Sequence, residues 1–200
     1  MRPPYASLWA LFSVGIMAEM LTKARTGPTQ FERLGLPKRF ALDAQQVERE
    51  YLARSRDAHP DFHRLASNEE QQVSLQQSAA LNEAYATLRE PFRRAEYLLQ
   101  LEGGPSAAEH KEMTPEFLEE MLDLRMEIEE LRESGGREST AIAEMEQQLI
   151  KRRDKLIDDL ACRFDKLESE GTNRDLLVQI RQTLNAAKYI QGLLRDLRAE

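Results

Sequence analysis

The sequence SAALNEAYATLREPFRRAEYLLQL, at Ser78–Leu101, carries two helical patterns in succession. Its apolar residues recur three and four positions apart, the spacing of one face of an α-helix. Pro91 interrupts the pattern, and proline suits the first turn of a helix. The stretch therefore predicts the end of one helix and the start of the next. The apolar positions expected on these two helices are Val73, Leu75, Leu81, Ala84, Tyr85 and Leu88, then Phe92, Ala95, Tyr97, Leu98 and Leu101.

Two more helices are expected before this stretch. A short one ends at Pro37, and a longer one begins after Asp43, whose carboxylate suits the N-cap position. The longer helix has to stop before Pro60, because proline disfavours helical geometry in the residue before it. The apolar positions expected on these helices are Phe31, Leu34, Leu36, Val47, Tyr51 and Leu52.

After the stretch, residues 102–106 (Glu-Gly-Gly-Pro-Ser) predict a break. From Thr114 onward, apolar residues alternate three and four apart in three runs, with breaks at 134–136 and 171–173. Short connections favour antiparallel neighbours, so the runs predict a three-helix bundle. The expected seams are Phe117, Met121, Leu124, Ile128 and Leu131; Ile142, Met145, Leu149, Leu156, Leu160, Phe164 and Leu167, with Arg152 in one slot; and Leu176, Ile180, Leu184, Ala187, Leu194 and Leu197.

The domain organisation follows from these breaks. No β-type alternation of useful length occurs, so the predicted fold is all-α. We expect an N-terminal extension at 1–29, a first helical domain at 30–101, a linker at 102–113 and the three-helix bundle at 114–200.

The composition excludes several classes of function. A formal charge of −7 and the lack of a basic stripe disfavour a nucleic-acid binder or an anionic-membrane binder. The single cysteine, Cys162, can form neither an intramolecular disulfide nor a CxxC zinc site. The sequence has no Gly-rich phosphate loop, so we expect no ATP hydrolysis by this chain itself. No cofactor, metal or enzymatic activity is expected.

The N-terminal run Leu8–Leu21 leaves its role open. It is apolar apart from Glu19, but it is shorter than the roughly 20 residues that a membrane-spanning helix needs. A signal peptide, an organellar transit peptide and a start at Met17 or Met20 are the alternatives. We expect a cytoplasmic protein, or a mitochondrial matrix protein if this segment is a targeting peptide.

A second apolar stripe on the first bundle helix predicts a protein-binding surface. At about 100° per residue, Leu118, Leu122 and Met126 project away from the seam, where a helix facing water should be polar. Residues 109–146 hold 13 acidic residues against 4 basic ones, a net charge of −9. Tyr189 also lies off the seam of its helix, as an aromatic anchor would. An apolar strip rimmed by carboxylates is typical of an interface; the alternative is that these side chains pack against the first domain.

The tripeptide His59-Pro60-Asp61 lies between two expected helices. Pro60 fixes its own φ and ends the preceding helix, so an imidazole and a carboxylate would be presented at a rigid corner. On its own, the tripeptide could equally be a turn that the aspartate caps. With the helix order around it, however, the region resembles the J-domain of HscB-type co-chaperones of iron–sulfur cluster assembly. The residues that carry the resemblance are Ser78–Leu101 and FERLGLPKRFALD at Phe31–Asp43. The bundle is similar to that family's C-terminal domain, and the resemblance extends over residues 30–198.

The resemblance implies a function and two binding surfaces. Such a co-chaperone docks on a DnaK/HscA-type ATPase chaperone, stimulates its ATPase and delivers the iron–sulfur cluster scaffold protein to it. The chaperone-binding residues implied are His59, Pro60, Asp61, Arg49, Arg54 and Arg56. Phe62 and His63 stand where family members commonly carry a lysine. The scaffold-binding residues implied are Leu118, Leu122, Asp123, Met126, Glu130 and Tyr189, and at Glu119 and Met126 the residue type departs from the family's.

Three other functions are compatible with parts of the sequence. A metalloenzyme could use His59, Asp61 and His63, but Pro60 breaks the helix that ligands four residues apart would need. A J-domain protein could serve a different protein client through the same stripe. A helical structural protein could carry the tripeptide by chance, and it would then stimulate no ATPase.

Overall fold

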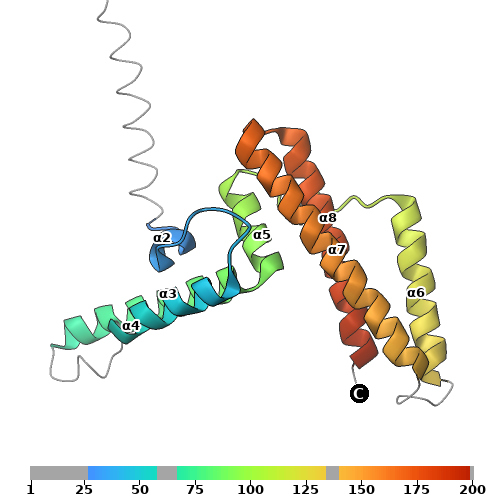
Figure 1. The fold of residues 1–200 in the computed structure, drawn as a ribbon, viewed down its shortest axis with the longest axis horizontal. Coiled ribbons are helices and arrows are strands. Elements are labelled where there is room, and N and C mark those ends of the chain that lie inside the picture. The colour runs from blue at the N-terminus through green and yellow to red at the C-terminus, as the bar shows by residue number, and fades with distance from the viewer. Residues whose placement is uncertain (1–26, 58–66, 134–139, 199–200) are drawn as a thin grey trace, which may run out of the picture. The chain divides into compact units, whose positions relative to one another are not determined.

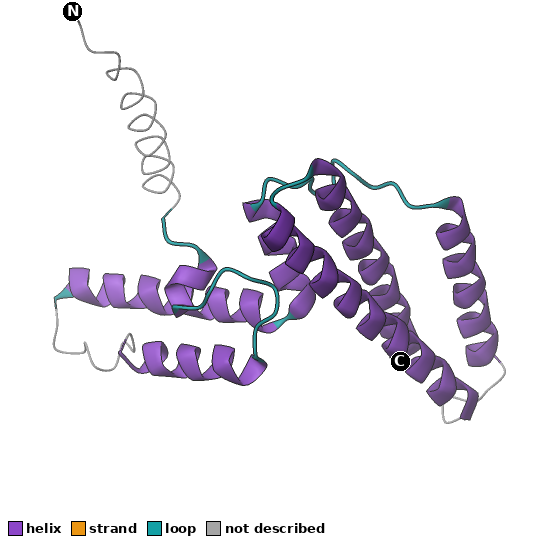
Figure 2. Cartoon of the chain, turned by 45° about the horizontal axis from the view of Figure 1, so that its top comes forward, coloured by secondary structure: helices purple, strands orange, loops and turns teal. Residues whose placement is uncertain are grey.

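The described part of the chain is helical. The computed structural model describes residues 27–57, 67–133 and 140–198, and within these ranges it contains helices and loops but no strand (Figure 2). The helices, labelled in Figure 1, are α2 (Gln30–Leu34), α3 (Ala44–Asp57), α4 (Asn68–Arg89), α5 (Pro91–Leu101), α6 (Pro115–Glu133), α7 (Thr140–Glu170) and α8 (Arg174–Arg198). The predicted all-α fold is confirmed.

These helices form two compact units. The N-terminal unit holds the described residues up to Lys38 together with Ala44–Ala86. The C-terminal unit holds Arg39–Asp43 and the described residues from Thr87 onward. Helix α5 therefore packs with α7 and α8, although it precedes the break at residues 102–106. That residues 102–113 link two independently folding segments stays a prediction.

The length of α2 follows from its two ends. Thr29 and Glu32 form a capping box, in which the Thr29 hydroxyl accepts a hydrogen bond from the Glu32 N–H at 3.2 Å and the Glu32 carboxylate accepts one from the Thr29 N–H at 2.8 Å. Gly35 ends the helix at φ +62°, a left-handed conformation that glycine adopts without strain. The helix thus stops before Pro37, earlier than predicted, while Phe31 and Leu34 are buried as expected.

In the N-terminal unit, α3 and α4 lie side by side (Figures 1 and 2). The Tyr51 hydroxyl of α3 donates to the Asn82 side-chain oxygen of α4 at 2.8 Å, and the Tyr51 ring stacks on Tyr85 with centroids 4.2 Å apart. Both contacts join the middle of α3 to the second half of α4. Val47 of α3 and Ala84 of α4 are fully buried.

Three apolar residues expected to be buried in this unit are exposed: Leu52, Val73 and Leu75. Ser74 of α4, which lies between Val73 and Leu75 in the sequence, is buried. Because successive helical residues are rotated by about 100°, Val73 and Leu75 point to either side of the buried face. The prediction that these three residues are buried is wrong. It relied on their apolar type and not on their angular position around the helix.

Helix α5 begins at Pro91 as predicted. The Glu90 carboxylate caps it by accepting a hydrogen bond from the Arg93 N–H at 2.7 Å. One turn on, the buried Arg94 guanidinium donates to the carbonyl oxygens of Leu88 at 2.8 Å and Phe40 at 2.6 Å. Burial lowers the pKa of Arg94, and the nearby Glu90 carboxylate opposes that change. The guanidinium stays cationic at neutral pH and ties the segment before α3 to α5.

In the C-terminal unit, α6, α7 and α8 alternate in direction (Figure 1), as the short connections predict. Their core contains the first seam, most of the second and the C-terminal end of the third, whose earlier members Ile180, Leu184 and Ala187 are also buried. The buried members are Met121, Ile128, Met145, Leu149, Ile190, Leu193, Leu194 and Leu197, with Phe117, Leu124, Leu131, Ile142, Ile150 and Leu156 packed against them. Each fully buried aliphatic side chain contributes about 1.5–3 kcal/mol. The expected seams are confirmed, and the break at 171–173 lies between α7 and α8 as predicted.

Helix α8 is buried on more faces than one seam requires. It contacts α5, α6 and α7. Its additional buried residues include Leu177, Arg181 and Leu193. The sequence pattern assigned α8 a single apolar face, because the packing of α5 against it could not be read from spacing within α8.

Arg181 forms a buried clamp within the C-terminal unit. Its side chain is only 3% exposed and makes a bidentate ion pair with Glu96 of α5, with one bond of 2.9 Å. Its Nε also donates to the Pro105 carbonyl oxygen at 2.9 Å. One guanidinium thus holds α5, the following loop and α8 together. Planar, two-pronged recognition of this kind is specific to arginine.

We predict that Arg181→Met destabilises the protein by about 2–3 kcal/mol, because it leaves the Pro105 carbonyl and the Glu96 carboxylate without their donor. The value stays below that of a fully buried pair, since Glu96 is half exposed and regains water. Urea denaturation followed by circular dichroism measures the change. Arg174→Met, at an exposed position of the same helix, is the matched control and should cost at most about 0.5 kcal/mol. Equal stability of the two variants would contradict the clamp.

Candidate partner-binding site

The predicted chaperone-binding face lies on α3. Three of its residues, His59, Pro60 and Asp61, lie outside the described residues. Arg49 and Arg56 are both exposed. They are seven positions apart and therefore lie on the same side of the helix. This pair forms the basic part of the face that the structure describes.

Arg54, the third predicted arginine, has a packing role in the N-terminal unit. Its guanidinium forms an ion pair with Glu50, one turn earlier on α3. It also lies against the turn after α2, since a Cβ added to Gly35 would come within 2.0 Å of an Arg54 nitrogen. The side chain is about one-third exposed. Its part in partner binding stays a prediction, and its contact with Gly35 is a second reason for glycine at that turn.

The α3 face has an apolar member that the sequence pattern placed in the core. Leu52 is exposed and lies three positions after Arg49 and four before Arg56. At that spacing the three side chains share one side of the helix. The surface is therefore mixed, with a leucine between two arginines. The i, i+3, i+7 spacing of these residues was the signal that could have identified it.

The apolar stripe of α6 is exposed as predicted. Leu118 is 43% exposed, Leu122 59% and Met126 63%. The seam residues Met121 and Ile128 of the same helix are buried. Helix α6 thus has two apolar faces, one in the bundle core and one open to solvent. Single exposed apolar side chains are common on protein surfaces, but a contiguous row of large ones is typical of an interaction site.

Tyr189 of α8 lies next to this stripe. It is 48% exposed, and its ring packs edge-on against Phe117 of α6 with centroids 5.9 Å apart. Phe117 immediately precedes Leu118 in the chain. The tyrosine is therefore supported on one side by the bundle and open on the other. An aromatic ring held in this way loses little conformational freedom when a partner covers it.

Carboxylates line the far edge of the stripe. Glu119, Asp123 and Glu130 are exposed on α6, and at about 100° per residue they fall on the side of the stripe that faces away from α8. Glu120 differs, because it forms an ion pair with Arg152 of α7. That contact also explains the polar residue at position 152 of the second seam.

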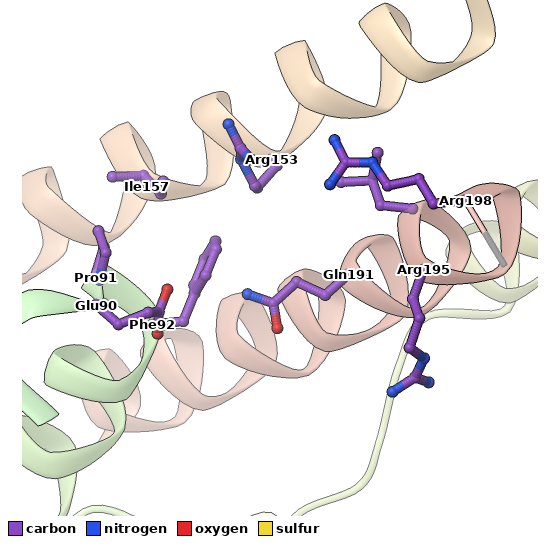
Figure 3. Close-up of a pocket in the computed structure, with 9 residues that line it drawn as sticks. Glu90, Pro91, Phe92, Arg153, Ile157, Gln191, Arg195 and Arg198 are labelled. Carbon is purple, nitrogen blue, oxygen red and sulfur yellow. The ribbon is translucent and has the colours of Figure 1, made fainter. Parts of the chain in front are cut away.

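A cavity of about 650 Å³ opens between α5, α7 and α8. Figure 3 shows Phe92 of α5 pointing into it, with Arg153 of α7 nearby. Arg153 forms an ion pair with Asp154, and Arg198 forms one with Glu146. The charges of these two arginines are thus compensated within the chain.

A second cavity, of about 510 Å³, was not foreseen from the sequence. It lies between α6, α8 and the loop before α6, and Tyr189 is part of its lining. Its basic residues are Lys111, Arg125, Lys188 and Arg195. We call it the α6–α8 pocket. The sequence signal was available only in part, since Arg125 lies seven positions after Leu118 and so on the same side of α6.

In the described ranges, no group of three or more His, Cys, Asp or Glu side chains is arranged to hold a metal ion. Likewise, none of the described helices combines the length and apolar character that a membrane span requires. Cys162 is an exposed free thiol on α7.

Comparison with known proteins identifies the family. Over 114 residues the chain is 39% identical to a protein named "Co-chaperone protein HscB homolog" from Vibrio cholerae serotype O1 strain ATCC 39541, and the match covers 56% of this chain and 67% of the relative. The chain belongs to the HscB family of co-chaperones. The homologues from two other Vibrio cholerae strains are 39% and 38% identical over the same length.

The HscB assignment includes both halves of the chain. A family model described as "HSCB C-terminal oligomerisation domain" matches residues 113–198. HscB from Vibrio cholerae superposes with a TM-score of 0.71 at 28% identity, covering 85% of this chain and 95% of that one. Human co-chaperone HscB gives 0.71 at 25% identity, covering 86% and 82%. The predicted architecture of an HscB J-domain followed by a helical C-terminal domain is confirmed.

Proposed function

We propose that this HscB-family co-chaperone stimulates the ATPase of a DnaK/HscA-type chaperone and delivers the iron–sulfur cluster scaffold protein to it. The bundle binds the scaffold through Leu118, Leu122, Met126 and Tyr189. Residues 59–61, together with Arg49 and Arg56 of α3, dock on the chaperone. ATP hydrolysis in the chaperone then locks the scaffold onto it and favours cluster transfer. The chain itself takes part as an adaptor and needs no catalytic group of its own.

The exposed stripe of α6 is the observation that supports scaffold binding most directly. A bundle helix that faces only water gains nothing from leucines at 43% and 59% exposure. Burying such side chains under a partner contributes about 25 cal/mol for each Å² of apolar surface removed from water. The carboxylates along its far edge add charge that can select a basic neighbour on the partner.

A J-domain co-chaperone for a different protein client is the alternative. It would use the same stripe, since the exposed leucines specify a partner without naming it. Binding of the stripe to the scaffold, compared with binding to unrelated client proteins of similar charge, separates the two functions.

The test is a steady-state ATPase assay on the purified partner chaperone. We predict that the chain alone raises the hydrolysis rate. The chain and the scaffold together should raise it by more than the sum of their separate effects, because the chain brings the scaffold to the chaperone that it stimulates itself. Stimulation that is indifferent to scaffold but responds to another client would favour the alternative. A chain that stimulates no partner ATPase would refute the co-chaperone mechanism.

The compartment can be settled separately. We propose a cytoplasmic protein, with the mitochondrial matrix as the alternative if Leu8–Leu21 belongs to a targeting peptide. The mass of the native protein shows whether residues 1–29 are retained.

A further inference from the structure

The α6–α8 pocket concentrates positive charge in an acidic protein. The whole chain carries −7, yet this pocket is lined by four basic residues and one acid, Asp196. The Arg125 guanidinium lies 3.9 Å from the Asp196 carboxylate, and the Arg125 side chain is 68% exposed. Among the described carboxylates, none is within ion-pairing distance of Lys111, Lys188 or Arg195. The pocket therefore carries positive charge that the chain does not neutralise.

Arg195 belongs to this pocket by its direction. It also borders the cavity between α5, α7 and α8. Figure 3 shows its side chain pointing away from Phe92 and Arg153 in that cavity. The guanidinium is thus available on the other side of α8, where Lys188 lies about two turns earlier on the same helix. At seven positions apart, these two residues share a helix face.

The pocket adjoins the apolar stripe on one side only. Taking Leu118 as the origin and about 100° per residue, Leu122 lies at about +40° and Arg125 at about −20° around α6, while Asp123 lies at about +140°. Arg125 thus lies between the stripe and α8, and the acidic edge lies beyond the stripe. Tyr189 lines the pocket and touches α6 through Phe117. Across this surface the order is carboxylates, apolar stripe, tyrosine, basic pocket.

A surface with opposite charges on its two edges fixes the orientation of whatever binds it. A partner turned by 180° would place its charges against like charges, which costs several kcal/mol. The apolar stripe alone has no such polarity, because leucine and methionine side chains accept apolar groups in any direction. The stripe therefore supplies contact energy, and the pocket fixes the orientation of the bound partner.

We propose that the α6–α8 pocket binds a carboxylate of the scaffold protein, presented beside the apolar residues that cover Leu118 and Leu122. This inference rests on the proposed scaffold binding and specifies the polarity of the bound segment. An aspartate or glutamate lies in the pocket between Lys188 and Arg195, the apolar residues lie over the stripe and Tyr189, and a basic residue faces Asp123 and Glu130. Arg125 exchanges its long contact with Asp196 for the incoming carboxylate.

The experiment compares two double variants of the full chain with the same loss of charge. Lys188→Gln with Arg195→Gln removes two of the four positive charges that line the pocket. Lys155→Gln with Lys166→Gln removes two exposed charges of α7 that lie outside the pocket. Isothermal titration with the purified scaffold protein is carried out at several salt concentrations. We expect the pocket variant to bind about 10-fold more weakly at low salt and to show a shallower decline with salt, because the two positive charges that flank the bound carboxylate are gone. The control variant should keep wild-type affinity.

Four outcomes decide between the claims. A pocket variant with wild-type affinity and salt dependence would overturn the pocket inference, while scaffold binding by the wild type would leave the proposed function standing. A control variant weakened as much as the pocket variant would also overturn it, since the effect would then come from net charge. A wild-type chain that does not bind the scaffold would overturn both. Rescue by Lys188→Arg with Arg195→Lys, which keeps the charges, would support the pocket specifically.

Discussion

Replacing Leu118 and Leu122 by alanine should weaken scaffold binding by about 30- to 1,000-fold. Two apolar anchors at the centre of an interface each contribute about 1–2 kcal/mol, and 1.4 kcal/mol corresponds to a tenfold change in Kd. The free energy of unfolding should change little, because both side chains are largely exposed and surface substitutions cost about 0.5 kcal/mol or less. Titration calorimetry measures the affinity, and urea denaturation of the same sample measures the free energy of unfolding.

A matched control for this variant exists on another helix. Val73 and Leu75 of α4 are also exposed apolar residues, and their replacement by alanine removes similar surface outside the stripe. This control should leave the scaffold affinity unchanged. If the stripe variant keeps its affinity and instead loses several kcal/mol of stability, the two leucines serve the packing of the protein and the surface is wrongly assigned.

The bundle was predictable because its seams are long and regular. Over α6 and α7, apolar residues repeat with the same spacing for several turns, so the periodic signal exceeds the noise of single positions. The exposed stripe was predictable for the same reason, since Leu118, Leu122 and Met126 violate the pattern that a helix in water should show. Both the regular seams and the stripe that departs from them can be identified from the sequence alone.

Contacts between distant segments were not predictable in this way. Arg181 pairs with Glu96, 85 positions earlier in the chain, and nothing in the local spacing of α8 indicates it. The α6–α8 pocket likewise needs side chains from α6, α8 and the preceding loop to meet. Such sites depend on which helices are neighbours, and helical periodicity reports only the direction in which each residue points.

The errors in the N-terminal unit have a different cause. Leu52 was assigned to the core because it is apolar, yet it lies among arginines on the outer side of α3. In a short helix few turns are available to establish the buried face, so one apolar residue can shift its inferred direction. Leu52 adds an apolar side chain to the α3 face that we propose binds the chaperone, and a mixture of charge and apolar contact suits a transient interface.

Asp61→Asn should abolish stimulation of the partner chaperone's ATPase. The substitution keeps the size of the side chain but removes its negative charge and turns one acceptor oxygen into a donor nitrogen. A partner group that donates to the carboxylate would then face another donor. The hydrolysis rate with the variant should equal that of the chaperone alone, measured at steady state with purified components.

The control for this variant is Glu69→Gln, an exposed acid-to-amide change at the start of α4, which should stimulate as the wild type does. Circular dichroism should give the same helix content for both variants, because neither change removes buried apolar surface. Loss of stimulation by Asp61→Asn alone would assign the effect to residues 59–61. Full stimulation by this variant would refute their role, even if the bundle still bound the scaffold, because the two halves of the adaptor act on different molecules.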